Sequence, residues 1–161
     1  MPKGKIIEIG AGPGRDAKAL VDYGFEYLGT DASEEVVNVA KEKNPGIEFV
    51  QMEAQKLNFP ANSFDGFWAS AVILHIPKNA IDEVFKGLKA VCKKGAVGFM
   101  TMKWGVGEKE DKKTGRWFAF YSEKELREVM ERNGIETIKV IRRKDTRPNY
   151  PDWLIFYVRI K

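Results

Sequence analysis

Short apolar runs alternate with amphipathic helical stretches along most of the chain, and this alternation limits the possible folds more than any other feature. Such a pattern is typical of repeated strand–helix units, in which the strands form a mainly parallel sheet and the helices cover it. The sequence therefore predicts an α/β, doubly wound fold. No internal repeat is present.

Seven segments have the composition of strands, and they cover residues 5–9, 26–30, 47–51, 64–69, 96–102, 135–141 and 153–160. Helical periodicity marks residues 16–23, 33–43, 80–92 and 122–133. Ser33 and Ser122 stand where N-cap residues are expected, and Gly134 suits a helix end. Because no helix separates the last two strands, we expect them to form a hairpin. The polar segment 105–115 is expected to be an exposed loop.

With 161 residues, of which 43% are hydrophobic, the chain is expected to form a single domain over residues 1–161. No apolar run approaches the roughly 20 residues that span a bilayer, and no leader peptide opens the chain, so we expect a soluble, cytoplasmic protein. Cys92 is the only cysteine, which argues against a disulfide and a structural metal. The net charge of +4 is spread along the chain and does not by itself indicate nucleic acid.

Gly10, Gly12 and Gly14 lie between the first strand and the first helix, where a glycine loop lets a ligand approach the backbone. Their G-x-G-x-G spacing differs from the dinucleotide fingerprint G-x-G-x-x-G, since Arg15 occupies the third glycine position. The chain also lacks the G-x-x-x-x-G-K-S/T pattern of triphosphate sites. The loop therefore predicts a polar ligand of another kind.

Two acidic residues follow the next two strands. Asp31 ends the second strand, where a carboxylate can accept both hydroxyls of a ribose. Glu53 and Ala54 follow the third strand, where a carboxylate and backbone amides can contact an adenine edge. The glycine loop together with Asp31 and Glu53 predicts a nucleoside-containing ligand.

The order of these motifs resembles the class I S-adenosylmethionine-dependent methyltransferases, in the small-molecule branch typified by the ubiquinone and menaquinone type (methyltransferase type 11) enzymes. The segments that carry the resemblance include the Glu8 to Gly14 loop, residues 63–70, 74–77, 91–96 and 121–126. The resemblance implies a Rossmann-like seven-stranded sheet of order 3-2-1-4-5-7-6 with strand 7 antiparallel. Two departures are Glu53, where the family usually has Asp, and Lys94-Gly95-Ala96, where it usually has Pro-Gly-Gly.

The resemblance further implies S-adenosyl-L-methionine as cofactor and S-adenosyl-L-homocysteine as product. The glycine loop would line the methionine and ribose portion, Asp31 would bind the ribose, and Glu53 would face adenine. Arg15 is a candidate partner for the cofactor carboxylate. The cofactor-binding residues that we expect are Glu8, Gly10, Ala11, Gly12, Gly14, Arg15, Asp31, Ala32, Glu53, Ala54, Ala69 and Ser70.

His75, the only histidine, follows the fourth strand and is a candidate general base, although a lone histidine is commonly a packed structural residue. Residues around the loop after the fifth strand form a candidate acceptor pocket or, alternatively, cap the core. They are Lys103, Trp104, Arg116 and Tyr121. A basic cluster near the last hairpin could hold an anionic or polynucleotide substrate, but a solvated hairpin end is the favoured interpretation. It consists of Arg142, Arg143, Lys144 and Arg147.

We therefore expect methyl transfer by in-line displacement to an unidentified small-molecule acceptor, which is favoured by elimination. The chain lacks an Asn/Asp-Pro-Pro-aromatic run after the fourth strand, which argues against methylation of an exocyclic base amine. Cys92 falls within an expected helix, which argues against a cysteine nucleophile for methylation at C5 of a pyrimidine. Two alternatives stay open: an RNA-modifying methyltransferase, and a non-catalytic cofactor-binding module that activates a partner. Because the first strand begins close to Met1, the family's usual N-terminal helices are expected to be missing. Either a homodimer or a wide, partly open pocket would follow.

Overall fold

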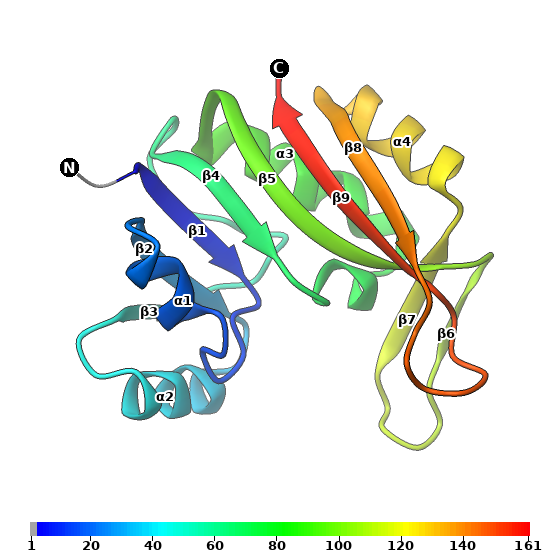
Figure 1. Cartoon of the computed structure of the whole chain (residues 1–161), viewed down its shortest axis with the longest axis horizontal. Helices are drawn as coiled ribbons and strands as arrows, with labels where there is room; N and C mark the ends of the chain where they lie inside the picture. Colours follow the sequence, from blue (N-terminus) through cyan, green and yellow to red (C-terminus); the bar gives the residue numbers. More distant parts are fainter. Residues whose placement is uncertain (1–2) are drawn as a thin grey trace.

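The structure of the chain is a computed structural model that describes residues 3–161. Its first half builds a unit of three parallel strands, in which one helix connects the first strand to the second and another connects the second to the third (Figure 1). The elements are β1 (Lys5–Ile9), α1 (Ala17–Asp22), β2 (Glu26–Asp31), α2 (Glu34–Lys43) and β3 (Glu48–Gln51). Strand β2 pairs in parallel with both β1 and β3.

The second half extends the sheet and adds two helices. Its elements are β4 (Phe64–Ala69), the 3-10 turns η1 (Ile73–His75) and η2 (Lys78–Ala80), α3 (Ile81–Val91), β5 (Cys92–Trp104), β6 (Glu108–Glu110), β7 (Trp117–Tyr121), α4 (Glu123–Arg132), β8 (Ile135–Arg143) and β9 (Trp153–Ile160). Strand β9 runs antiparallel to its two neighbours, β5 and β8, so the last two strands form the expected hairpin.

The main sheet runs β3-β2-β1-β4-β5-β9-β8, because β9 pairs with β5 on one side and with β8 on the other. Strands β9 and β8 are the seventh and sixth of the seven strands expected from the sequence. The sheet thus has the predicted order 3-2-1-4-5-7-6 with strand 7 antiparallel, and the fold-class prediction is confirmed.

The hairpin of β6 and β7 was not expected from the sequence. The prediction of a loop over residues 105–115 is wrong for β6, which pairs antiparallel with β7. All three residues of β6 are exposed, so it carries no alternation of buried and exposed side chains. Strand β5 also begins earlier than the sequence predicts, at Cys92, which is the last residue of the predicted helix 80–92. Burial raises the pKa of the Cys92 thiol to about 12, so the thiolate is disfavoured.

The predicted helix ends are confirmed by their capping contacts. Ser33 Oγ accepts a hydrogen bond from the Val36 amide at 3.3 Å, and Ser122 Oγ accepts one from the Glu125 amide at 3.1 Å. Gly134 follows α4 with a φ of +74°, the left-handed conformation that ends many helices.

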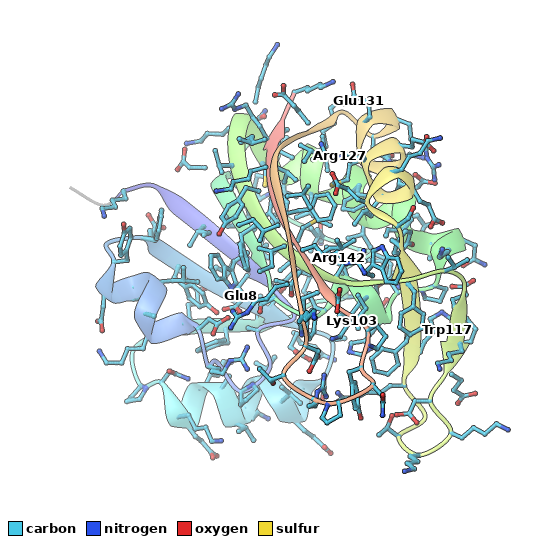
Figure 2. All side chains as sticks on the ribbon, turned by 45° about the vertical axis from the view of Figure 1, so that its right-hand side comes forward. Glu8, Lys103, Trp117, Arg127, Glu131 and Arg142 are labelled. Atoms are coloured by element: carbon cyan, nitrogen blue, oxygen red, sulfur yellow. The ribbon has the colours of Figure 1, made fainter. Side chains whose placement is uncertain are left out.

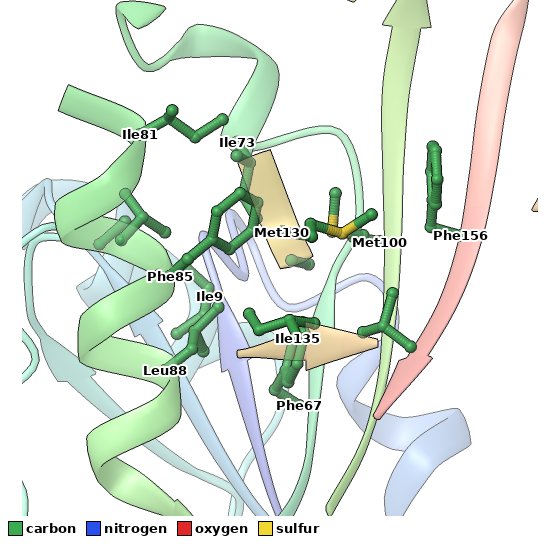
Figure 3. Packing of buried hydrophobic residues seen from close by; sticks show 14 of the residues in the cluster. Ile9, Phe67, Ile73, Ile81, Phe85, Leu88, Met100, Met130, Ile135 and Phe156 are labelled. Atoms are coloured by element: carbon green, nitrogen blue, oxygen red, sulfur yellow. The ribbon is translucent and has the colours of Figure 1, made fainter. Parts of the chain in front are cut away.

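Two apolar clusters lie on opposite faces of the sheet. The larger cluster packs α3 and α4 against β4, β5, β8 and β9, and Figure 3 shows Phe85 and Leu88 of α3 close to Met130 and Ile135. The smaller cluster packs α1 and α2 against the first three strands and includes Leu20 and Val37. In Figure 1, α3 and α4 lie behind the sheet, whereas the visible face of β4, β5, β9 and β8 has no helix over it within residues 3–161.

A row of side chains on this side of the sheet runs from β1 to β9. Glu8, Trp68, Phe99 and Tyr157 occupy successive paired positions on β1, β4, β5 and β9. The rings of Trp68 and Phe99 stack with centroids 3.9 Å apart, and Phe99 meets Tyr157 edge to face at 5.6 Å. The row leads from the glycine-loop half of the molecule to the last hairpin. No helix within residues 3–161 is long and apolar enough to cross a membrane.

Candidate active site

The carboxyl ends of β1, β2 and β3 are tied together by hydrogen bonds, and this edge collects most of the expected cofactor residues. The Ala11 amide donates to the Thr30 carbonyl at 2.8 Å, and the Met52 amide donates to the Asp31 carbonyl at 2.8 Å. The Gln51 side chain donates to the Ala32 carbonyl at 3.0 Å. The glycine loop, Asp31 and the turn at Glu53 therefore form one continuous edge.

The three glycines of the loop have positive φ but different surroundings. A Cβ on Gly10 would lie 2.2 Å from Val72 Cγ2, and one on Gly14 would lie 2.4 Å from Asn44 Nδ2. A Cβ on Gly12, at a φ of +57°, would meet no atom within 4 Å. Gly10 and Gly14 are thus required by packing, whereas the space beside Gly12 is open to a ligand.

Asp31 is oriented by two backbone amides. Its Oδ2 accepts a hydrogen bond from the Gly12 amide at 3.0 Å, and its Oδ1 accepts one from the Ser33 amide at 3.1 Å. Each oxygen of a carboxylate has two lone pairs, so each retains one position for a further donor. The half-buried carboxylate can therefore accept two hydroxyls next to the open space at Gly12, which fits a ribose.

Glu8 is buried beneath the loop, with 3% of its surface exposed. The Tyr27 hydroxyl donates a short hydrogen bond to Glu8 Oε2, and the Thr30 hydroxyl donates to the Glu8 carbonyl at 2.9 Å. Burial raises the pKa of the Glu8 carboxyl to about 7, although the Tyr27 hydrogen bond opposes this shift. Glu8 can therefore hold a proton near neutral pH.

The turn after β3 places one exposed and one buried residue at the edge. Glu53 is exposed and forms an ion pair with Lys56 at 3.1 Å, whereas Ala54 is buried in the larger apolar cluster. The Lys56 amide donates to the Glu53 carbonyl at 3.0 Å and closes the turn. An adenine edge could reach the Glu53 carboxylate and the backbone of this turn.

The end of β4 contains a strained residue that the sequence did not indicate. Ala71 has a φ of +55°, which L-residues with a Cβ rarely adopt. Its amide donates to Thr101 Oγ1 of β5 at 2.8 Å. This contact turns the chain sharply after Ala69 and Ser70, the residues expected at the methionine part of the cofactor. No sequence pattern relates Ala71 to Thr101, which is 30 positions away.

A pocket of about 410 Å³ lies between the ends of β4, β5 and β9 and the loop that joins β8 to β9. Arg15, Ser70 and Ala71 line it on the side of the glycine loop, and Arg143 and Lys144 line it on the side of the last hairpin. The pocket thus connects the expected cofactor edge with part of the expected basic cluster. Its volume is within the range of small-molecule sites.

Comparison with known sequences decides the family. Residues 6–95, which are more than half of the chain, match the methyltransferase domain family. The chain belongs to the class I S-adenosylmethionine-dependent methyltransferases. A 91-residue segment of this methyltransferase domain is 29% identical to a demethylmenaquinone methyltransferase of Renibacterium salmoninarum. That match covers 55% of this chain but only 38% of the Renibacterium enzyme.

Three further comparisons cover more of the methyltransferase domain. An uncharacterized protein of Methanocaldococcus jannaschii is 30% identical over 86% of this chain and 68% of its own length. The crystal structure of a Methanosarcina mazei S-adenosylmethionine-dependent methyltransferase has 20% identity and a TM-score of 0.85 over 99% of this chain and 93% of that one. A didemethyltoxoflavin methyltransferase of Burkholderia thailandensis, solved with S-adenosylhomocysteine, has 19% identity and a TM-score of 0.82 over 99% and 72%. These two structures share the fold described above.

The candidate base of the methyltransferase domain, His75, lies in η1 and contacts β7. Its Nδ1 lies 2.8 Å from the Trp117 carbonyl oxygen, and its ring meets Phe118 edge to face at 4.7 Å. Burial lowers the pKa of the imidazole. A neutral ring that donates from Nδ1 to the carbonyl would keep a lone pair on Nε2 for a proton.

The four expected acceptor residues are not brought together at one place. Lys103 is buried, and its ammonium group donates to the Asp145 carboxylate and, at 2.8 Å, to the Pro151 carbonyl. The same nitrogen lies 3.6 Å from the centre of the Trp153 ring. Figure 2 labels Lys103 and Arg142 above the loop that joins β8 to β9. Lys103 thus anchors this loop to the end of β5.

The other three lie at separate positions around the hairpin of β6 and β7. Trp104 lines a second pocket, of about 510 Å³, and the Arg142 guanidinium covers its ring at 3.8 Å. Arg116 is exposed in the hairpin turn. Tyr121 is buried, and its hydroxyl is the one buried side-chain polar atom without a hydrogen-bond partner within residues 3–161.

Proposed function

We propose that the chain binds S-adenosyl-L-methionine and transfers its methyl group to a small-molecule acceptor. The observation that carries this proposal is the pairing of Asp31 with the Gly12 amide beside the open space of the glycine loop. A carboxylate at the end of β2 with free acceptor positions suits the two hydroxyls of a ribose. Residues 1–161 would act as one methyltransferase domain.

The residues along the carboxyl edge would divide the cofactor between them. Asp31 and Ala32 would hold the ribose, and Glu53 and Ala54 would face the adenine. The methionine part would lie along the glycine loop, including Gly10, Ala11 and Gly14, and would reach Ala69 and Ser70 at the end of β4. Glu8 would support the loop from below, and Arg15, which lines the 410 Å³ pocket, would meet the methionine carboxylate.

The reaction needs alignment more than proton transfer. When bound, the cofactor would supply a methyl group on a positively charged sulfur. A lone pair of the acceptor would form the new bond to carbon, and the sulfur would keep the electrons of the broken bond. Any acceptor proton would pass to a base or to water. The chain would hold both partners at the edge of the sheet and limit the access of water. His75 is the proposed base for acceptors that must lose a proton.

Calorimetric titration with S-adenosylhomocysteine tests the binding half of the proposal. We expect one site per chain, together with a rise in the unfolding temperature that grows with ligand concentration. NAD provides the matched control, because it also contains adenosine but carries a pyrophosphate that the G-x-G-x-G loop is not expected to bind. Binding of NAD without binding of S-adenosylhomocysteine would refute the assignment.

Methyl transfer is tested separately with labelled S-adenosylmethionine and a panel of small acceptors. The proposal requires the label to appear in a small product. Binding of S-adenosylhomocysteine without transfer to any member of a broad panel would instead favour a non-catalytic module. In a parallel assay with RNA in place of the small acceptors, label recovered only in RNA would favour the RNA-modifying alternative.

A further inference from the structure

We propose that the methyl acceptor carries an anionic group, such as a carboxylate or phosphate, which Arg143 and Lys144 bind in the 410 Å³ pocket beside the glycine loop. This inference rests on the proposed methyltransferase function and adds the chemical class of the acceptor. The acceptor would consist of an apolar body on the wall of the pocket and an anionic group at its basic rim.

The charges of the last hairpin show why these two cations matter. Of the four basic residues in this cluster, Arg142 is paired with Asp152 at 2.8 Å and Arg147 with Asp145 at 2.8 Å. Asp145 also accepts from Lys103, and these hydrogen bonds, chiefly the one from Arg147, hold the pKa of its carboxyl well below its usual range. Asp145 is therefore ionised and fully engaged at neutral pH.

Arg143 and Lys144 remain without an ion-pair partner in the part of the chain that the structure describes. Both line the 410 Å³ pocket. Two adjacent cations on the rim of a concave site attract an anion more strongly than the same charges on a convex surface, because the pocket walls reduce screening by water. An arginine can also bind a carboxylate or phosphate through two parallel hydrogen bonds.

The rest of the pocket is suited to a compact apolar body. Phe99, Trp153 and Ile155 supply apolar surface from β5 and β9. Trp153 is held in place by the Lys103 ammonium on its ring, and Phe99 by its stack with Trp68. The aromatic walls are thus fixed by the sheet, while Ser70, Thr101 and Thr146 provide hydroxyl groups. The pocket therefore combines an apolar wall with hydroxyl groups and cations, which suits an acceptor with an apolar body and an anionic group.

The pocket also lies where an acceptor must lie for transfer. Arg15 follows the glycine loop, and Ser70 and Ala71 follow β4, so three lining residues belong to the proposed cofactor edge or adjoin it. The two cations come from a different part of the chain, because Arg143 ends β8 and Lys144 follows it. An acceptor held between them would direct its uncharged end toward the cofactor edge.

The same charge distribution disfavours a polynucleotide acceptor. RNA binding normally uses several unpaired cations along a surface. Here two of the four cations of the cluster are neutralised by aspartates, and the remaining two face a single pocket. The arrangement is therefore better suited to one anionic group than to a chain of phosphates.

NMR titration tests the inference. The full chain is saturated with S-adenosylhomocysteine and then titrated with 2-naphthoate or with its neutral analogue 2-naphthamide. We expect naphthoate to bind at least ten-fold more tightly and to shift the amide signals of Ser70 and Ala71. The double variant R143Q/K144Q should abolish this preference. The control K112Q/K113Q removes the same charge from the exposed turn of the β6–β7 hairpin and should leave the preference unchanged.

Other outcomes overturn the inference. Equal affinities for the two probes, or a preference for naphthoate that survives in R143Q/K144Q, would show that these cations do not select the ligand. If S-adenosylhomocysteine itself fails to bind while naphthoate binds to the free chain, the methyltransferase function falls and the pocket loses its role as an acceptor site. Displacement of naphthoate by an RNA oligonucleotide, in a salt-sensitive manner, would replace the small-molecule acceptor with a polynucleotide.

Turnover provides the second test. In the labelled acceptor panel, we expect compounds with a carboxylate or phosphate to be methylated with kcat/KM at least ten-fold above that of their amides or esters. In R143Q/K144Q this preference should disappear, mainly because KM rises for the anionic compounds. The affinity of this variant for S-adenosylhomocysteine should equal that of the unmodified chain. Preferential methylation of the neutral analogues by the unmodified chain would contradict the inference directly.

Discussion

At the scale of single residues, Asp31 is the side chain on which cofactor affinity should depend most. The variant Asp31→Asn keeps the shape but replaces one acceptor oxygen with an amide that cannot accept from Gly12, Ser33 or a ribose. We expect the affinity for S-adenosylhomocysteine to fall by about 10- to 100-fold, equivalent to about 1–3 kcal/mol. Calorimetry measures the effect. Asp22→Asn in α1, whose carboxylate pairs with Lys18 alone among residues 3–161, is the control.

The glycines of the loop should separate binding from stability. Gly12→Ala places a methyl group in open space at a positive φ, so we expect a stability loss of about 1–2 kcal/mol but a large loss of cofactor affinity. Gly14→Ala adds a clash with Asn44 and Phe49 to the same backbone strain and should destabilise the fold more. Denaturant titration and calorimetry on both variants measure the two effects. Equal loss of stability in the two variants would contradict this distinction.

Glu8 should make folding stability depend on pH. Because its folded pKa of about 7 lies above the ordinary value of 4.5, the folded chain binds more protons than the unfolded chain between these values. Its contribution to the free energy of unfolding must therefore fall as the pH rises through this window. Glu8→Gln, which keeps an acceptor for Tyr27, should be more stable than the unmodified chain at pH 8, by about 1–3 kcal/mol, and show no such advantage at pH 4.

Denaturant titrations of the two proteins at several pH values measure this difference. The contribution of His75, whose pKa is also shifted, is common to both proteins and cancels. If the difference in the free energy of unfolding between the two proteins is constant from pH 4 to pH 8, the pKa of Glu8 is not raised by folding.

At the scale of elements, the exposed side chain of Glu108 on β6 adds a contact between the β6–β7 hairpin and η2, beside the pairing of β7 with β5. Glu108 Oε2 accepts hydrogen bonds from the Lys78 amide at 2.8 Å and from Trp117 Nε1 at 2.9 Å. Glu108→Ala removes both contacts, so we expect faster hydrogen exchange and proteolysis within residues 106–116. The global unfolding temperature should change little, because β6 buries no apolar side chain. Glu110→Ala on the same strand is the control, and equal effects of both variants would contradict the proposed role of Glu108.

Elements with a strong local signal were predictable from the sequence, and elements formed by tertiary contact were not. The caps at Ser33 and Ser122 and the buried strands follow from short-range residue patterns, which is why their positions were confirmed within a few residues. Strand β6 consists of Glu-Lys-Glu and exists only through backbone pairing with β7, so periodicity could not reveal it. Strand β5 likewise gains its early start from pairing at Cys92.

The same division applies to the site. The glycine loop and Asp31 are recognisable because their residues are adjacent to strand ends in the sequence. The pocket is different, because Phe99, Arg143 and Trp153 meet only after β9 inserts between β5 and β8. The pairing of Lys103 with Asp145 and of Arg142 with Asp152 also depends on this insertion, and it decides which cations stay free.

At the scale of the whole molecule, the two apolar clusters lie on opposite faces of one continuous sheet, and this arrangement predicts a single cooperative unit. Leu20 of α1 belongs to the smaller cluster and Leu88 of α3 to the larger one. If both faces unfold together, Leu20→Ala and Leu88→Ala should each shift the same thermal transition to lower temperature. The expected losses are about 2–5 kcal/mol, with Leu20 nearer the lower value because its surface is 8% exposed, against 0% for Leu88.

Calorimetry and tryptophan fluorescence on these variants test the single-domain proposal. We expect the two methods to give the same transition temperature, and S-adenosylhomocysteine to raise it in both. A ligand bound on the edge of β1 and β2 stabilises the whole cooperative unit, by about 2.7 kcal/mol at 100 times its Kd. Val39→Ala, at an exposed position of α2, is the control and should leave the transition within a degree or two. Two separate transitions, each sensitive to only one of the leucines, would instead divide the chain into an independent cofactor-binding half and an independent half around α3 and α4.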